Sequence, residues 1–185
     1  MGKLVGLGVV GVIIVALLLV GGSYVSAKNQ MVAKDQTVKS SWSEVDVQLE
    51  RRADLIPNLV ETVKGFTKEE NSVFSEIANA RAGMINAQTP QAKIAANGAL
   101  DSALGRLLVL TENYPNLRSS EQFMRLQDEL AGTENRISVA RRHYNQAIQD
   151  YNTFIQQFPN SIWAGMAGYH TNDAYFKARD RKSVV

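Results

Sequence analysis

Few side chains in this sequence could carry out chemistry, and their spacing does not assemble a reactive site. Cysteine is absent, which excludes disulfides, thiolate metal sites and a cysteine nucleophile. The two histidines, His143 and His170, are far apart in the chain, and the Glu-x-x-His pairs of di-metal helical bundles are missing. Phosphate-binding loops, serine elbows and zinc-protease motifs are missing too. We therefore predict no enzyme, no catalytic residue, no metal site and no cofactor, with His143 on a helix surface and His170 in a loop.

Polar side chains beside apolar positions are the remaining candidates for a functional role. One group surrounds Arg51, Arg52 and Asp54, and another follows Gly132. Such side chains can pair across helices and fix which helix faces which, or they can form solvated helix faces. A third use is a docking motif for a partner protein. Gly132 lies inside a helical pattern, where glycine is unfavourable, and this predicts close backbone packing there.

Composition limits the class of protein. Apolar residues make up 45% of the 185 residues and charged residues 21%, which is typical of a globular protein. The formal net charge of +2 predicts no concentrated basic surface, so we expect no nucleic-acid partner.

The N-terminal segment predicts a membrane anchor over residues 1–27. Residues 4–21 contain no charge and would span about 27 Å as a helix, close to the thickness of a hydrocarbon core. Tyr24 stands where an interfacial aromatic belongs, and Lys28 closes the apolar run. The alternative is a signal peptide cleaved after Ala27.

Flanking cations predict the orientation of this anchor. Lys3 precedes it, whereas Lys28, Lys34 and Lys39 follow it. By the positive-inside rule, the short N-terminus lies outside and the body lies in the cytoplasm.

Residues 28–158 show helical periodicity throughout. Apolar residues recur three or four positions apart along three seams, over residues 42–77, 96–114 and 123–158, with Arg52 as a polar exception. Short connections make neighbouring helices antiparallel. We therefore predict an all-α fold, in which the transmembrane helix is followed by an antiparallel four-helix bundle.

Pro57 interrupts the first seam and leaves two alternatives open. Asp54 could cap a new helix that holds Pro57 in its first turn, or a single long helix could be kinked at Pro57. A break at Pro57 would give an even number of helical passes and return residue 158 towards the membrane.

The tail, residues 159–185, combines aromatic and basic residues and suits a membrane surface. The candidate membrane contacts are Trp163, Tyr169, Tyr175, Phe176, Lys177, Arg179, Arg181 and Lys182.

Three sequence blocks resemble the LemA family. They run from Trp42 through Arg52 to Gly65, from Glu112 to Leu117, and from Leu126 to Asn145, and the resemblance covers residues 24–160. This chain departs from the family pattern in having Ala53 for an aromatic residue and Phe66 for a tyrosine, and its tail is less family-like. The candidate interaction or structural positions are Trp42, Asp46, Arg51, Arg52, Asp54, Pro57, Asn58, Glu112, Asn113, Tyr114, Pro115, Gly132, Glu134, Asn135, Arg136 and Tyr144.

The resemblance implies a single-pass protein of the bacterial inner membrane with a cytoplasmic helical bundle and no established catalytic activity. Relatives include a protein needed to form magnetosome membranes, and family members are often encoded beside a membrane zinc metallopeptidase. Two functions follow as hypotheses. The first is a scaffold that forms homo-oligomers and organises membranes or membrane-protein assemblies. The second is an adaptor for a membrane metallopeptidase or another membrane protein, acting through Arg51, Arg52 and Asp54.

Overall fold

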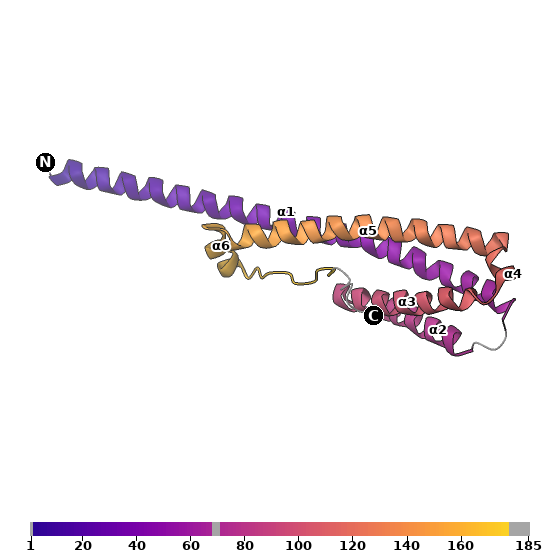
Figure 1. Ribbon diagram of the computed structural model, residues 1–185. Helices are drawn as coiled ribbons and strands as arrows, with labels where there is room; N and C mark the ends of the chain where they lie inside the picture. The colour runs from indigo at the N-terminus through magenta and orange to yellow at the C-terminus, as the bar shows by residue number, and fades with distance from the viewer. Residues whose placement is uncertain (1, 68–70, 178–185) are drawn as a thin grey trace, which may run out of the picture. The chain divides into compact units, whose positions relative to one another are not determined.

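A computed structural model describes residues 2–67 and 71–177, and within these ranges the chain is helical and contains no strand (Figure 1). The helices are α1 (Gly2–Lys64), α2 (Asn71–Asn86), α3 (Pro90–Thr111), α4 (Pro115–Arg118), α5 (Glu121–Gln156) and α6 (Asn160–Ala167). This confirms the all-α fold with a long apolar helix at the N-terminus. The antiparallel four-helix bundle and the domain boundaries at residues 27 and 158 stay predictions.

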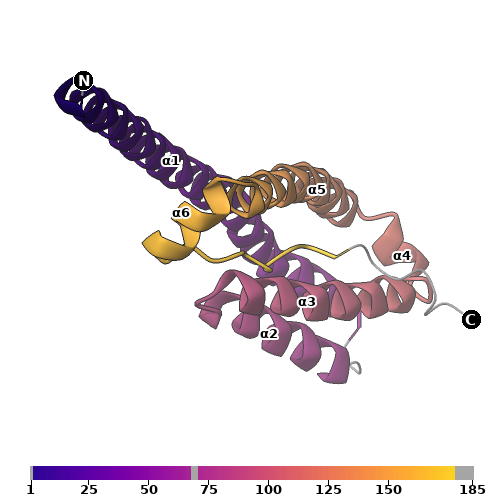
Figure 2. The same ribbon diagram turned by 90° about the vertical axis from the view of Figure 1, so that its left-hand side faces the viewer.

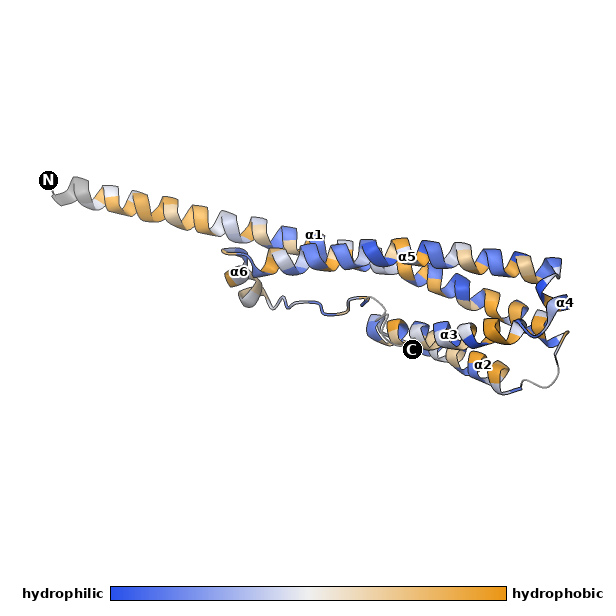
Figure 3. Cartoon of the chain, viewed as in Figure 1, coloured by the Kyte–Doolittle hydropathy of each residue, from blue (hydrophilic) through white to orange (hydrophobic). Residues whose placement is uncertain are grey.

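The first part of α1 is the candidate membrane helix. Residues 6–22 are all exposed, and the most apolar window of this helix reaches a mean hydropathy of 2.5 (Figure 3). By length and composition, it is the one helix among the described residues that could cross a membrane.

Pro57 lies inside α1, so the alternative in which it begins a new helix is wrong. A proline has no N–H for the carbonyl four residues earlier, which here belongs to Ala53. The Nε–H of Arg81 on α2 donates to that carbonyl at 2.8 Å. A residue on another helix therefore satisfies the acceptor that Pro57 leaves open.

Helix α1 ends seven residues after Pro57 instead. The N–H groups of Phe66 and Thr67 both turn back to the carbonyl of Val63. The apolar seam predicted to continue over residues 42–77 is interrupted here, because Phe66 is exposed once the helix has ended.

The described residues group into two compact units. In unit 2, residues 40–145 with 174–177, the second half of α1 packs with α2, α3 and the first part of α5. Helices α2 and α3 lie side by side (Figure 2). Its most deeply buried large side chains are Leu49, Ile56, Leu59, Ile77, Leu100, Leu107, Leu117, Phe123, Ile137 and Tyr144.

Unit 1 contains residues 1–39 and 146–173, and so holds the candidate membrane helix, the end of α5 and all of α6. Its buried apolar side chains are Ala27, Met31, Val38, Ala147, Ile148, Tyr151, Ile155 and Ala164. The ammonium of Lys34 on α1 lies 5.4 Å from the ring centre of Phe154 on α5.

Candidate functional site

Helix α6 lies against α1 at the end of the candidate membrane helix. The rings of Tyr24 and Trp163 meet edge to face, with their centres 5.6 Å apart. The helix ends at Gly168, whose φ of 76° needs a residue without Cβ strain, and the N–H of Tyr169 donates to the carbonyl of Ala164. Two of the predicted membrane contacts, Trp163 and Tyr169, therefore lie in the unit that holds the membrane helix.

An apolar row runs along the outside of this segment. Phe158, Ile162 and Met166 are spaced four residues apart, and they are 82%, 51% and 72% exposed. Ile162 and Met166 share a face of α6, because side chains spaced by four lie on one side of a helix, and Phe158 lies in the turn before that helix. Phe158 and Ile162 were not among the residues predicted to touch a membrane. Phe158 was predicted to lie on the apolar seam of residues 123–158, and this is wrong, because α5 ends at Gln156 and leaves Phe158 exposed. Three exposed apolar residues beside a candidate membrane helix form a surface suited to lipid.

The rest of the predicted membrane contacts divide into two groups. Tyr175 and Phe176 belong to unit 2, where Phe176 is half-buried in a pocket of protein side chains, and Lys177 is exposed. Phe176 is thus held by protein side chains in unit 2, and its contact with a membrane stays a prediction. Arg179, Arg181 and Lys182 lie outside the described residues.

In unit 2 one residue of the predicted polar motif, Arg52, is buried and forms ion pairs. Its Nη1 lies 2.6 Å from a carboxylate oxygen of Asp101 on α3 and 2.8 Å from one of Glu134 on α5. The same nitrogen donates to Asn97 Oδ1 at 3.2 Å. The guanidinium therefore connects α1 to α3 and α5. Arg52 is 7% exposed, so these contacts are made in the interior of unit 2.

This placement bears on the adaptor hypothesis. Arg51 and Asp54 are exposed, but Arg52 faces the interior and is already paired. A partner protein could reach only part of the predicted docking motif. The sequence had placed Arg52 correctly as a polar residue on an apolar seam, yet it gave no sign of Asn97 and Asp101, which were not among the candidates.

Other predicted polar positions on α1 and α5 form contacts within the protein. Asp46 is paired with Lys93 of α3, and Arg136 Nε donates to Gln48 Oε1 at 3.3 Å. Asn58 is exposed, and its carbonyl accepts a hydrogen bond from the hydroxyl of Thr62.

Gly132 does not have the close backbone neighbour that was predicted. A Cβ at this position would meet only the guanidinium of Arg136, at an ordinary 3.7 Å. The prediction of tight helix packing at Gly132 is therefore wrong.

The block from Glu112 to Pro115 forms the turn that connects α3 to α5. Glu112 follows the last residue of α3, and Tyr114 precedes α4, with its carbonyl accepting from Leu117 and Arg118. Leu117 is fully buried, so the turn is anchored to the core of unit 2. The contacts of this block thus include a structural role in the turn, and a role in binding a partner stays a prediction.

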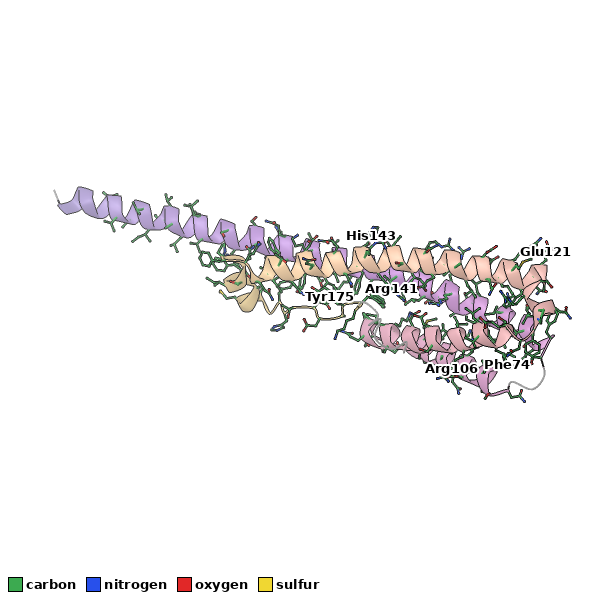
Figure 4. All side chains as sticks on the ribbon, in the orientation of Figure 1. Phe74, Arg106, Glu121, Arg141, His143 and Tyr175 are labelled. Carbon is green, nitrogen blue, oxygen red and sulfur yellow. The ribbon has the colours of Figure 1, made fainter. Side chains whose placement is uncertain are left out.

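Trp42 and Tyr144, two of the predicted positions, belong to an aromatic cluster in unit 2. Their ring centres are 5.2 Å apart, and both lie within 6.2 Å of the ring of Phe176. The guanidinium of Arg141 lies over the Phe176 ring at 4.9 Å. Figure 4 labels Arg141 and also Tyr175, the residue before Phe176. Burial raises the pKa of the Tyr144 phenol above its ordinary value.

An open groove of about 670 Å³ lies between α1 and α5 in unit 2. Its apolar floor includes Val47 and Val139, both exposed. Its rim carries Glu44 and His143, with 3.8 Å between the imidazole Nδ1 and the carboxylate, and both side chains are mainly exposed. Asn135 and Arg136 line the same groove. His143 is thus a surface histidine, as the sequence predicts.

The described residues contain no candidate metal site. No group of three histidine, aspartate or glutamate side chains that could hold an ion occurs within residues 2–67 and 71–177.

Comparison with known proteins gives consistent relatives. The sequence model of the LemA family matches residues 41–185, and so includes the tail that had looked less family-like. Magnetosome protein MamQ 2 of Paramagnetospirillum magneticum is 26% identical, with 82% of this chain and 65% of the relative covered. Magnetosome protein MamQ of Magnetospirillum gryphiswaldense is 25% identical, with 76% and 61% covered. Protein LemA of Metamycoplasma hominis is 24% identical, with 87% and 74% covered. The chain therefore spans less than two thirds of the length of these MamQ proteins.

Proposed function

The chain belongs to the LemA family, and from this membership we propose that it is a non-catalytic, single-pass membrane protein that self-associates into a scaffold organising the membrane around it. Its relatives include magnetosome proteins and a LemA protein, all from bacteria, so the membrane we propose is the bacterial inner membrane. The candidate membrane helix supplies the anchor.

The observation that carries this proposal is the exposed apolar row, on α6 and in the turn before it, beside the candidate membrane helix. Tyr24 is at the end of that helix, and its contact with Trp163 holds α6 at the same level. There Phe158, Ile162 and Met166 can enter the interface between headgroups and acyl chains. A helix held at this depth beside a transmembrane span occupies area in one leaflet, which gives the chain a means to organise lipid.

Tryptophan quenching tests this part of the proposal. The chain has two tryptophans, so Trp42→Phe leaves Trp163 as the only reporter of α6. In nanodiscs with lipids brominated near the headgroup, we expect strong quenching of Trp163, and weaker quenching when Phe158, Ile162 and Met166 are replaced by serine. The matched control is Trp163→Phe, in which Trp42 reports from its contact with Tyr144. Equal quenching of the two tryptophans would refute a membrane-bound α6.

The groove between α1 and α5 supports the self-association. Its floor is apolar, and its rim carries Glu44 as well as Arg136, so a second copy could match it with the same residues. Sedimentation velocity in a mild detergent tests this. We expect Val47→Lys to shift the full chain towards the monomer. Val109→Lys should leave it assembled, because Val109 is equally exposed but lies on α3, outside the groove. A wild-type chain that is monomeric at every concentration would exclude the scaffold.

We further propose that the body lies in the cytoplasm, with the short N-terminus outside. The three lysines that follow the membrane helix, against one before it, support this orientation. Because the chain has no cysteine, Ser161→Cys gives a single thiol on an exposed position of α6. In intact cells this thiol should resist a membrane-impermeant reagent and react after lysis. Labelling of this thiol in intact cells would show that the body lies outside the cell, and would refute the proposed orientation.

A further inference from the structure

The residues around Phe176 have the properties of a built binding pocket within unit 2. Trp42 from α1 stacks on the Phe176 ring with an angle of 22° between the planes, and Tyr144 from α5 meets it edge-on at 79°. Arg141 covers the ring as a cation. Aromatic stacking, edge-to-face contact and a cation–π contact thus converge on one side chain.

The backbone of Phe176 is recognised as well. The side-chain amide of Asn145 donates from Nδ2 to the Phe176 carbonyl at 2.8 Å. Its Oδ1 accepts the Phe176 N–H at 2.9 Å. One asparagine therefore satisfies both backbone groups of a residue that belongs to no helix or strand. The pocket therefore binds both the extended backbone and the aromatic side chain of Phe176.

The same backbone recognition occurs in unit 1. There Asn152 of α5 donates to the carbonyl of Asn172 and accepts its N–H, both at 2.8 Å. An asparagine that binds a backbone N–H and carbonyl does not depend on the side chain of the residue it holds. At Phe176 the aromatic and cationic neighbours of the ring are added to such a clamp, so we take Phe176 as the anchor of the segment.

We propose that the pocket formed by Trp42, Arg141, Tyr144 and Asn145 is a binding site for an extended peptide with an aromatic anchor, and that the C-terminal segment of a second copy of this chain is its partner. The chain's own Phe176 shows what fits. A second copy carries the same segment, so each contact made within one chain can be made between two. This inference rests on the self-association proposed above and names the contact that carries it.

The connection to the segment is suited to such an exchange. After α6 the chain turns at Gly168, in a backbone conformation that only glycine adopts without strain. No helix or strand follows in residues 169–177, so the segment can leave or enter the pocket as an extended piece. Exchange of an identical element between copies needs no new interface chemistry, because the contacts are those of the monomer.

The first experiment asks whether the pocket accepts a peptide from another molecule. The full chain with Phe176→Ala, in mild detergent, leaves the pocket without its own anchor. A fluorescent peptide of residues 169–177 should bind it saturably in an anisotropy titration. The same peptide with alanine in place of Phe176 should bind about tenfold or more weakly, as expected for an anchor residue.

The chain also offers a matched pair of protein variants. Asn145→Ala, added to Phe176→Ala, should weaken peptide binding, whereas Asn135→Ala should not, because Asn135 lies on the same helix but outside the pocket. Absence of saturable binding, or equal binding of the two peptides, would overturn the pocket.

The second experiment distinguishes a second copy from the chain's own tail. One tagged copy carries p-azidophenylalanine at position 176 and Asn145→Ala, and a differently tagged copy carries Phe176→Ala with an intact pocket. After illumination we expect crosslinked dimers, with the attachment mapped to Trp42 or to residues 141–145 of the second copy. Crosslinks within single chains only would overturn the exchange between copies, even if the groove variants show that the protein assembles. A monomeric wild-type protein whose pocket binds the peptide would instead refute the scaffold and leave the pocket standing.

Discussion

The contact between Arg81 and the carbonyl of Ala53 should hold α1 together at its internal proline. Ala53 is 2% exposed, so without Arg81 its carbonyl would have neither an intrahelical donor nor free access to water. Removing a charged donor from a buried acceptor costs about 1.5–3 kcal/mol. We therefore expect Arg81→Met, which keeps the length of the side chain, to lower the free energy of unfolding of unit 2 by about 2 kcal/mol.

A double-mutant cycle isolates this effect from the general loss of the arginine. Pro57→Ala restores the backbone N–H that can donate to Ala53 within the helix. In that background Arg81→Met should cost about 1–2 kcal/mol less, because the acceptor is no longer left unpaired. A coupling energy of that size would link two residues that are 24 positions apart in the sequence and lie on different helices.

Urea unfolding in detergent gives the measurement. In a Trp163→Phe background, the fluorescence of Trp42 reports on unit 2 alone. Arg118→Met is the control, since Arg118 is exposed and should change stability little in either background. Equal costs of Arg81→Met with proline and with alanine at position 57 would refute the reasoning. The contact at 2.8 Å would then contribute nothing that the helix needs.

Three further predictions concern single positions in unit 2. Gly132→Ala should stabilise the unit by about 0.5–1 kcal/mol in the same urea assay, as should Gly98→Ala, because both glycines lie within helices with room for a methyl group. Arg52→Met should destabilise it by about 3 kcal/mol, because the carboxylate of Asp101 loses the cation paired with it and keeps only neutral donors such as Asn97. Asp101→Leu added to Arg52→Met should recover much of that loss. Burial raises the pKa of the Tyr144 phenol above its unfolded value of 10.0, so the contribution of the neutral phenol to the stability of unit 2 is complete below pH 10 and is lost as the pH rises through the folded-state pKa. The variant Tyr144→Phe should lack this loss of stability at alkaline pH, as measured by urea unfolding across that range.

Helical periodicity was sufficient to predict the class of fold and much of the core. Val45, Leu49 and Ile56 are buried because side chains three or four positions apart share a helix face. The end of α1 could not be predicted in the same way. Pro57 is the strongest local signal for a helix end, and what overrides it is a hydrogen bond from Arg81, which lies 28 residues beyond its acceptor Ala53.

Phe176 shows a similar limit for the candidate sites. An aromatic and basic tail has the composition of a membrane-contacting segment, and the sequence cannot separate that use from an aromatic residue held in a protein pocket. The distinction depends on Asn145, whose amide binds the backbone of the tail. Because Asn145 binds backbone groups, its contact does not depend on the type of the residue at position 176, and the sequence cannot reveal it. Only the structure places Phe176 in unit 2. Phe158 shows the opposite limit, because its spacing continues the apolar seam of residues 123–158 and predicts a core position, yet the structure leaves it exposed.

The buried position of Arg52 has a further consequence for a protein built from similar helices. Several apolar seams of nearly equal spacing could pack in more than one register, since leucine and isoleucine contacts discriminate weakly between neighbouring positions. A buried ion pair adds little net stability, but it penalises every arrangement in which its partners are missing. Arg52 meets Asn97 and Asp101 on α3 and Glu134 on α5, so a shift of either helix relative to α1 would break part of these contacts. We infer that this cluster is retained to specify the arrangement of unit 2, and that arrangement in turn brings Trp42 and Tyr144 together to form the pocket for Phe176.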